Sequence, residues 1–285
     1  MRISKASGEP CPNAKSCTDL IETKEPKFFL KTRTFLLDHT DTFPYILRYP
    51  SSINKTMNLK TETKTTSKLI NGCCFEVMNT MPDNAFDVVF TSPPYNRKRN
   101  DKYNNHTDIV DDYYQFLHDS VSDCLRVCKG NVFYNIQKNS YNRQDVHRLM
   151  GAFAPELIEV IIWHKSNPMP NPHVINAYEY ILVLSSENKS LKANKTYTKN
   201  HFTTPVYSAN PYKHIHRAVM NPEVCSHVLL NFAKEGDSVL DPFMGMGTTG
   251  AVCSSMGMNF TGIEKSLEYY QEASKRINEE TQLTF

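Results

Sequence analysis

The fold is decided by the stretch Phe86-Asp87-Val88-Val89-Phe90-Thr91-Ser92-Pro93-Pro94-Tyr95-Asn96. Its first part, 86–90, is apolar except for one aspartate, which predicts a buried strand. The two prolines end that strand, because neither carries an N–H and each fixes its own φ near −65°. We therefore expect a rigid loop at the carboxyl end of the strand, with carbonyl groups that can accept hydrogen bonds from a ligand.

The side chains of this loop suit a planar ligand that carries an exocyclic amino group. Ser92 supplies a hydroxyl group and Tyr95 supplies a flat aromatic face. Cytosine and adenine are ligands of this kind. A strand followed by two prolines is also a common exit turn, so the catalytic interpretation depends on a second motif.

The second motif is a glycine turn, Asp241-Pro242-Phe243-Met244-Gly245-Met246-Gly247-Thr248-Thr249, at the end of a predicted strand over 238–241. Glycines let the backbone approach a ligand, and the helix that begins at Thr248 presents unpaired N–H groups. Glu264 lies about 20 residues further on, at the end of the next predicted strand, where an acid can bind ribose hydroxyls. This spacing predicts a ligand that contains adenosine.

Two other nucleotide-binding motifs do not fit this turn. No Gly-Lys-Ser/Thr follows it, so it is not a phosphate-binding loop. Gly245, Gly247 and Gly250 match the spacing of a dinucleotide fingerprint. Such a fingerprint does not begin with Asp-Pro-Phe, however, which argues against NAD.

Composition is typical of a globular protein that works inside a cell. The 285 residues carry a net charge of +2, and 40% of them are hydrophobic. No stretch approaches the ~20 apolar residues that span a bilayer, and residues 1–24 lack the apolar core of a secretory signal. We expect no membrane contact and an intracellular location, in the cytoplasm or on DNA. The eight cysteines form no Cys-x-x-Cys pair, so we expect reduced thiols and no metal site.

Two regions differ in composition. Residues 1–66 form a polar extension, which we expect to be only partly ordered. From 67 to 285, apolar runs alternate with helical patterns, which predicts a largely parallel sheet with helices on both faces. Strands are expected at 86–90, 131–136, 157–163, 179–184, 238–241 and 259–263, and helices near 113–128, 222–236, 248–256 and 267–277.

Two loops carry positive charge. The first contains Arg97, Lys98 and Arg99 directly after the Ser-Pro-Pro-Tyr segment, and the second contains Lys192 and Lys195. Runs of charge are often only solvated surface. Beside a pocket for a base, however, they predict contacts with phosphates, which position a nucleic acid without reading its sequence.

Several stretches in one order resemble the DNA amino-methyltransferases, which modify the exocyclic nitrogen of cytosine or adenine with S-adenosyl-L-methionine. More narrowly, the chain resembles the permuted beta subgroup, in which the catalytic half precedes the cofactor half. The resemblance covers about residues 68–280. It implies a Rossmann-like methyltransferase fold, in which a mostly parallel seven-stranded sheet has helices on both faces, with a methyltransferase domain over 67–285 and a short target-recognition insertion at about 185–212. The matching stretches are Thr91–Asn96, Trp163–Pro170 with Glu179–Leu182, Asp241–Thr249 and Gly262–Glu264, and more loosely His216–Pro222.

The resemblance also implies roles for individual residues. Ser92 and the Pro93 carbonyl would accept hydrogen bonds from the amino group, in a loop stiffened by Pro94. Tyr95 would stack on a base that is flipped out of the duplex. The residues that would bind the cofactor are Asp241, Pro242, Phe243, Gly245, Gly247, Thr248 and Glu264.

One departure from the family concerns the adenine of the cofactor. Members often carry Gly-Asp ahead of the catalytic strand, whereas this chain has Asn71-Gly72-Cys73-Cys74. Either a backbone group or Asn71 takes the place of the acid, or cofactor binding is weaker. An inactive relative that only binds nucleic acid stays an alternative.

The expected activity is methylation of cytosine N4 in duplex DNA, because the family associates a serine at the first motif position mostly with cytosine. Methylation of adenine N6 is the near alternative, and methylation of RNA or of a glutamine side chain is a more distant one. Carbon-5 methylation of cytosine would require a Pro-Cys nucleophile at a strand end, and the sequence has none there. The expected partner is double-stranded DNA. A homodimer and a companion restriction endonuclease are consistent with the short insertion and the family.

Overall fold

The computed structural model describes residues 65–97, 109–170, 173–186, 191–196, 198–207, 210–212, 214–216 and 218–283. These residues all belong to one compact unit, Leu59–Phe285. Nearly all of the extension predicted for 1–66 lies outside the described residues, as do Lys98 and Arg99. Within the described part, no helix is long and apolar enough to cross a membrane.

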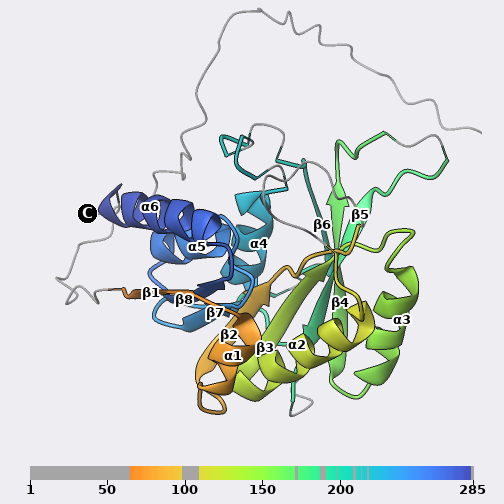
Figure 1. Ribbon diagram of the computed structural model, residues 1–285, viewed down its shortest axis with the longest axis horizontal. Helices are drawn as coiled ribbons and strands as arrows, with labels where there is room; N and C mark the ends of the chain where they lie inside the picture. Colours follow the sequence, from red (N-terminus) through yellow and green to blue (C-terminus); the bar gives the residue numbers. More distant parts are fainter. Residues whose placement is uncertain are drawn as a thin grey trace, which may run out of the picture. The chain divides into compact units, whose positions relative to one another are not determined.

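A sheet of eight strands forms the centre of this unit (Figure 1). Its order is β1-β8-β7-β2-β3-β5-β4-β6, in which β5 runs antiparallel to both neighbours and every other pair is parallel. The strands are β1 (Ser67–Asn71), β2 (Phe86–Thr91), β3 (Cys128–Ile136), β4 (Leu157–Lys165), β5 (Tyr178–Leu184), β6 (His201–Thr204), β7 (Ser238–Asp241) and β8 (Asn259–Glu264).

This architecture confirms the predicted fold class, with one strand more than the seven expected. Two strands, β1 and β6, lie outside the six predicted ranges. β6 falls within the segment 185–212 and pairs with the end of β4, from Ile162 opposite His201 to Lys165 opposite Thr204. Its four residues alternate between exposed and buried, and only one of them, a phenylalanine, is a large apolar residue. The sequence therefore has no apolar run that predicts the edge strand β6.

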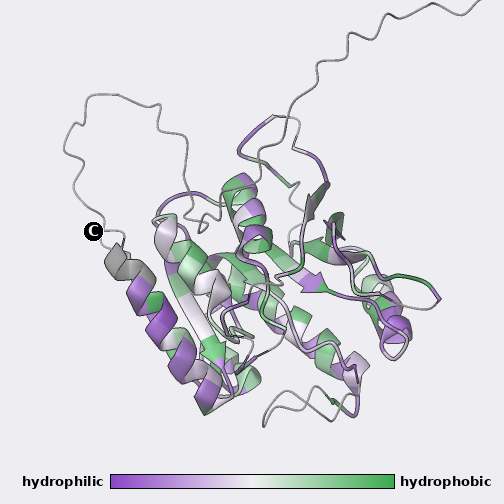
Figure 2. Cartoon of the chain, turned by 90° about the horizontal axis from the view of Figure 1, so that it is seen from above, coloured by the Kyte–Doolittle hydropathy of each residue, from purple (hydrophilic) through white to green (hydrophobic). Residues whose placement is uncertain are grey.

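Helices pack on both faces of the sheet, and the side chains of a strand alternate between these two faces. On β2, Val89 packs in the cluster that includes α1, α2 and α3, whereas Val88 and Phe90 pack in the cluster that includes α4, α5 and α6. The two helical layers flank the sheet in Figure 1, and Figure 2 shows that the helices also carry hydrophilic residues. The helices are α1 (Cys74–Asn79), α2 (Tyr113–Val127), α3 (Arg143–Ala152), α4 (Pro222–Phe232), α5 (Thr248–Ser255) and α6 (Leu267–Leu283).

The helices predicted from periodicity are present, with differences at their ends. α2 ends at Val127, so that Cys128 begins β3 and does not continue the helix. α4 begins at Pro222, and the side chain of Asn221 caps it by accepting a hydrogen bond from the N–H of Glu223. α6 continues to Leu283, beyond the predicted end.

The strand order reverses between β7 and β2. The chain proceeds from β2 to β3 on one side of this point and from β7 to β8 on the other. Val88 lies opposite Val239 and Val89 opposite Leu240 in a parallel pair, so β2 and β7 end at the same edge of the sheet. In open α/β sheets, ligands bind outside the carboxyl ends of the strands at such a switch point. The two predicted motifs are therefore brought to one place.

Candidate active site

The loop that follows β2 is held from two sides. The hydroxyl of Tyr113, at the start of α2, donates to the carbonyl oxygen of Pro94 at 2.7 Å. The side-chain amides of Asn139 and Asn142 each donate to the carbonyl oxygen of Tyr95 at 2.9 Å. These bonds, added to the fixed φ angles of the prolines, give a preorganised loop.

The carbonyl oxygen of Pro93 differs from its two neighbours. Among the described residues, nothing donates a hydrogen bond to it, whereas the carbonyl oxygens of Pro94 and Tyr95 are both engaged. A carbonyl acceptor in a rigid loop without a partner can take a hydrogen bond from a ligand. The role expected for Pro93 requires such an acceptor and stays a prediction.

Ser92 and Tyr95 join a network of buried polar groups. The Ser92 hydroxyl lies 2.7 Å from the Tyr95 hydroxyl, which in turn donates to Glu179 Oε2 at 2.9 Å. The amide of Asn135, on β3, donates to the Tyr95 hydroxyl at 2.7 Å and to Glu179 Oε2 at 2.9 Å. Residues of β3 and β5 thus converge on the catalytic motif in the loop after β2.

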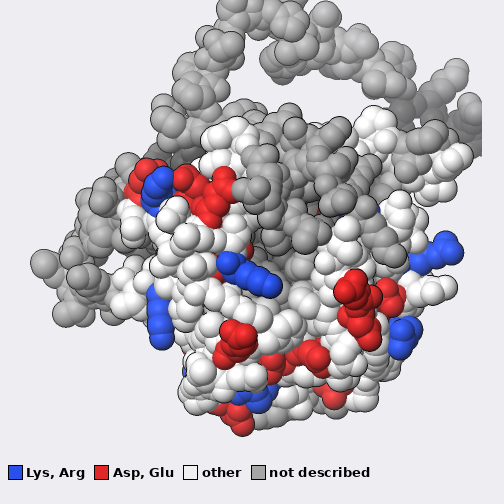
Figure 3. All heavy atoms as spheres, viewed as in Figure 1, with Lys and Arg blue, Asp and Glu red and all other residues white. Residues whose placement is uncertain are grey.

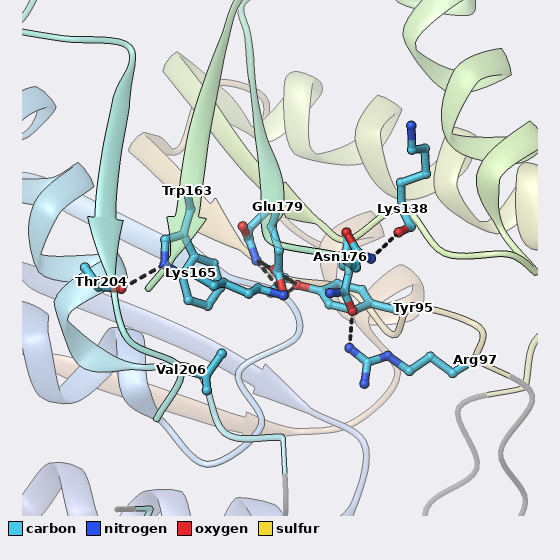
Figure 4. A network of polar contacts seen from close by, with 12 residues as sticks. Tyr95, Arg97, Lys138, Trp163, Lys165, Asn176, Glu179, Thr204 and Val206 are labelled. Carbon is cyan, nitrogen blue, oxygen red and sulfur yellow. Dashed lines mark hydrogen bonds and ion pairs between the residues drawn. The ribbon is translucent and has the colours of Figure 1, made fainter. Parts of the chain in front are cut away.

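An ion pair completes this network. Lys165 Nζ, at the end of β4, lies 2.7 Å from Glu179 Oε1, and each of the two side chains is only 6% exposed. Figure 4 shows Lys165 reaching towards Glu179, with Tyr95 beside the same carboxylate. A buried carboxylate needs such an opposite charge, because burial removes its solvation.

The Tyr95 hydroxyl keeps its proton in these surroundings. Burial, and then the negative charge of Glu179, raise the pKa of the Tyr95 hydroxyl well above its ordinary value of 10.0. Its ring also lies 5.6 Å from the guanidinium of Arg97. The hydroxyl therefore acts as a fixed hydrogen-bond donor, a function that the expected stacking role did not include.

The turn after β7 is organised around Asp241, which supports the site from within. Asp241 Oδ1 accepts from the Thr91 hydroxyl at 2.7 Å and from the N–H of Phe243 at 3.1 Å, and Oδ2 accepts from the Thr249 hydroxyl at 2.6 Å. Its side chain is buried, which raises the pKa of its carboxyl to about 6. The resemblance implies that Asp241 contacts the cofactor, but its oxygen atoms face the protein.

The glycines of the turn divide by their surroundings. Gly245 (φ +53°) and Gly247 (φ +73°) both have left-handed backbone, which favours glycine. A Cβ on Gly247 would lie 3.0 Å from side-chain atoms of Ala273 and Ile277, so this glycine lets α6 pack closely. A Cβ on Gly245 would meet no atom closer than 3.9 Å. Gly245 is thus the position where the backbone is open to a ligand.

The residues of the turn also differ in their burial. Phe243 and Gly245 are half-buried, whereas Pro242, Gly247 and Thr248 are buried. The Thr248 hydroxyl accepts from Arg276 Nη1, on α6, at 3.0 Å. Pro242, Gly247 and Thr248 therefore shape the turn, and Phe243 and Gly245 remain the positions that a ligand can reach.

Glu264 and Asn71 lie at the ends of the neighbouring strands β8 and β1. Glu264 Oε2 accepts from the N–H of Gly245 at 2.9 Å, and Oε1 accepts from the N–H of Ser266 at 2.7 Å. Asn71 is exposed, and its amide donates to the carbonyl oxygen of Glu264 at 2.8 Å. A carboxylate beside an open glycine turn fits the hydroxyl groups of a ribose, and an exposed amide fits a base edge, so these residues suit an adenosine-containing cofactor.

The two motifs, 150 positions apart, are directly connected. The bond between Thr91 and Asp241 joins the end of the catalytic strand to the start of the glycine turn. Phe243, in the turn, also packs on Phe116 of α2 with ring centroids 5.6 Å apart. The structure therefore brings the predicted catalytic and cofactor residues to the same edge of the sheet.

The predicted DNA contacts are only partly at this edge. Arg97 follows the catalytic loop and donates to the side chain of Gln137. Lys192 and Lys195 do not lie beside the pocket, because the intervening Asn194 donates to the carbonyl oxygens of Leu230 and Ala233 at the end of α4, which leads to the amino end of β7. On the face shown in Figure 3, basic and acidic side chains of described residues are interspersed.

Three important residues of the site were not predicted. Asn135, Lys165 and Glu179 lie in strands β3, β4 and β5, and all three are buried. A polar residue inside a buried strand is a signal that sequence reading can use, because such a residue needs a partner. Lys165 and Glu179 do occur in stretches that resemble the family.

Comparison with known proteins agrees with this geometry. The sequence model of a family described as DNA methylase matches residues 86–275, which is about two thirds of the chain. The chain is a member of the DNA methylase family. The type II methyltransferase M.HinfI of Haemophilus influenzae is 28% identical over 244 residues, which cover 74% of this chain and 68% of M.HinfI. The type II methyltransferase M2.MboI of Moraxella bovis is 24% identical over 244 residues, covering 75% and 88%.

Solved structures of other methylases share the fold. The cytosine-N4-specific PvuII DNA methyltransferase superposes with a TM-score of 0.63 at 17% identity, over 77% of this chain and 92% of that one. TTHA0409 of Thermus thermophilus, in complex with S-adenosyl-L-methionine, gives a TM-score of 0.56 at 22% identity, over 76% and 95%. The chain is thus a DNA amino-methyltransferase of the N4/N6 family in both sequence and architecture.

Proposed function

We propose that this DNA methylase transfers a methyl group from S-adenosyl-L-methionine to the exocyclic N4 of cytosine in duplex DNA. The observation that carries the proposal is the pair of acceptors in the catalytic loop, the Ser92 hydroxyl and the unengaged Pro93 carbonyl, beside the glycine turn after β7. Two acceptors fit the two N–H groups of an amino group. S-adenosyl-L-methionine, when bound, supplies an electrophilic methyl group.

The amino acids of the loop would make the amino nitrogen more reactive. The lone pair of an aromatic amine is delocalised into the ring, so the amine is a weak nucleophile. Hydrogen bonds to Ser92 and to the Pro93 carbonyl favour a tetrahedral nitrogen and stabilise the positive charge that develops there. Tyr95 would contact the flipped base, because a paired base cannot reach the site.

The cofactor would be held by the part of the site that belongs to the second motif. Glu264 would bind ribose hydroxyls, and Phe243 and Gly245 are the accessible residues of the turn. Asn71 would meet the adenine in place of the acid that the family often carries there. Buried Asp241, Pro242, Gly247 and Thr248 would keep the turn in shape.

Two considerations favour cytosine as the target. A serine at the first position of the motif is associated with cytosine in the family that the chain resembles. The PvuII enzyme, which shares the fold, is cytosine-N4-specific. Adenine N6 is the alternative, because its amino group offers the same two donors.

Partners and context follow from the same proposal. The substrate would be double-stranded DNA, and Arg97, which follows the catalytic loop, would meet a phosphate near the flipped base. The relatives named type II methyltransferases make a companion restriction endonuclease a reasonable partner. A homodimer would compensate for a short target-recognition segment.

The test is to express the chain in a bacterial host without its own DNA methyltransferases and to digest the DNA to nucleosides. Mass spectrometry should detect N4-methylcytosine, and sequencing of modified bases should reveal one recurrent site. A Ser92→Ala variant should lose the modification and still bind S-adenosyl-L-methionine in calorimetry. N6-methyladenine would overturn the choice of base, and unmodified DNA together with no heat of cofactor binding would indicate an inactive relative.

A further inference from the structure

We propose that the buried pair Lys165–Glu179 fixes the direction of the hydrogen bonds at the catalytic loop, so that Ser92 offers the target base an acceptor and not a donor. The inference rests on the proposed function, because it concerns how the same pocket selects an amino group. It makes Lys165 and Glu179 positioning residues that act through Tyr95. The family resemblance assigned them no role.

The ion pair sets the direction of the first hydrogen bond in this network. Lys165 Nζ, 2.7 Å from Glu179 Oε1, has only protons to donate, so Glu179 must accept there. A charged carboxylate is a pure acceptor, and its second oxygen, Oε2, faces both Tyr95 and Asn135 at 2.9 Å. Every neighbour of Glu179 in this network must therefore donate to it.

The orientation of the Asn135 amide follows from the charge of Glu179. Its Nδ2 lies near three oxygens, those of Glu179, Tyr95 and Ser92, at 2.9, 2.7 and 3.4 Å. Turning the amide around would place its carbonyl oxygen against the carboxylate, two acceptors in contact. The orientation with the amide nitrogen towards Glu179 is thus required, and Asn135 donates to the Tyr95 hydroxyl.

The single proton of Tyr95 is then assigned. Because Asn135 donates to the Tyr95 oxygen and the Glu179 carboxylate can only accept, the Tyr95 proton points to Glu179. Burial and the charge of Glu179 raise the pKa of the Tyr95 hydroxyl, which keeps that proton in place. The contact of 2.7 Å between Tyr95 and Ser92 must consequently be a donation from Ser92 to Tyr95.

The lone pairs of the Ser92 oxygen remain available to a ligand. Its only proton is used towards Tyr95, and among the described residues only the long contact of 3.4 Å from Asn135 reaches its oxygen. The half-buried Ser92 oxygen can therefore accept a hydrogen bond from a base. It cannot donate one without breaking the series of hydrogen bonds that leads back to Lys165. The Ser92 oxygen therefore binds an amino group of a base and repels a carbonyl group at the same position.

The substitution Glu179→Gln tests this, because it should remove the fixed direction of these hydrogen bonds. Lys165 would hold the carbonyl oxygen of the new amide, whose NH2 group would then face Tyr95. The Asn135 amide would turn as well, because two NH2 groups cannot face each other. The Tyr95 proton would then go to the Asn135 carbonyl oxygen or to Ser92 and no longer to residue 179. Ser92 would no longer be restricted to accepting from the base, so the preference of the pocket for an amino group should fall.

The measurement compares two duplexes by fluorescence anisotropy in the presence of S-adenosyl-L-homocysteine. One carries the amino base at the target position, and the other carries its oxo counterpart, uracil for cytosine or hypoxanthine for adenine. Both target bases lie opposite an abasic site, so that extrusion costs the same. We expect the wild type to prefer the amino base, and Glu179→Gln to lower this preference at least tenfold. Its kcat should fall about 100-fold with the KM for S-adenosyl-L-methionine unchanged.

A second variant and two controls separate direction from loss of structure. Tyr95→Phe removes the acceptor for the Ser92 proton without adding a donor, so it should also lower the preference, and it decides the question if Glu179→Gln does not fold. Glu268→Gln on α6 and Tyr178→Phe on β5, both at exposed positions, should behave as the wild type. Equal weakening of both duplexes, or an unchanged preference in the folded variants, would overturn the inference. Unmodified DNA from the wild type would instead overturn the proposed function.

Discussion

Replacing Asp241 by asparagine should make the stability of the protein less dependent on pH. Burial raises the pKa of this carboxyl from 3.8 to about 6, because hydrogen bonds from Thr249, Thr91 and the N–H of Phe243 offset only part of the lost solvation. The folded protein therefore holds the proton more tightly than the unfolded chain. The stability that Asp241 contributes is fully present below about pH 4 and is lost as the pH rises through 6.

The size of the effect follows from the two pKa values. A difference of about two units corresponds to about 3 kcal/mol over the full range. Between pH 5 and 7 the loss is about 1.3 kcal/mol, since the unfolded carboxyl is already charged at pH 5 and the folded one is still mostly neutral. An asparagine has the shape of the neutral carboxyl and does not titrate. The melting temperature of the wild type should thus fall relative to that of Asp241→Asn by about 3–5 °C over this interval.

The assay is thermal unfolding of both proteins at pH 5, 6, 7 and 8 in buffers of equal ionic strength. The quantity that matters is the difference between the two melting temperatures at each pH, which cancels the titration of all other groups. Asp111→Asn, at an exposed position, serves as the matched control and should show a constant difference from the wild type. A difference for Asp241→Asn that stays constant from pH 5 to 8 would show that burial does not govern this carboxyl.

Four further outcomes follow from the site. Gly247→Ala should lower the free energy of unfolding by roughly 2–4 kcal/mol in urea denaturation, because it combines a left-handed backbone with contacts of 3.0 Å to α6. Gly245→Ala should cost only about 1 kcal/mol, since its Cβ meets open space, and should weaken cofactor binding in calorimetry. Thr91→Val should cost about 1–3 kcal/mol through the buried bond to Asp241, and an unchanged melting temperature would contradict that bond. Glu264→Gln should reduce affinity for S-adenosyl-L-methionine about tenfold while the protein stays folded; equal affinity would remove Glu264 from the ribose site.

The sequence predicted the centre of the sheet better than its edges. β2 is buried on both faces, so its residues are apolar apart from Asp87 and Thr91, and the sequence indicates a strand. β1, with the sequence Ser-Lys-Leu-Ile-Asn, and β6, with His-Phe-Thr-Thr, are short and partly exposed. Such strands owe their conformation to a neighbouring strand, and that partner cannot be seen in the local sequence.

The candidate site was also predicted only in part from the sequence. The Ser-Pro-Pro-Tyr loop and the glycine turn carry their own backbone chemistry, and the structure places both at the switch point. The pair Lys165–Glu179 depends on the register of β4 against β5, in which Trp163 lies opposite Glu179. Register is set by the whole sheet, so no local pattern indicates which lysine meets which acid. Lys192 and Lys195 were misplaced for a related reason, because a charged loop does not reveal which helix end it packs on.

The central position of β2 has a consequence for how the protein is made. Its partner on one side, β3, follows after about 40 residues, whereas Val88 meets Val239 only when 151 further residues have been added. Until then one edge of this buried strand is open, and open edges recruit strands from other chains. A nascent or truncated chain that stops before Ser238 should therefore depend on chaperones. Methyl transfer should begin only once residue 264 has left the ribosome, so that an unfinished chain does not methylate DNA.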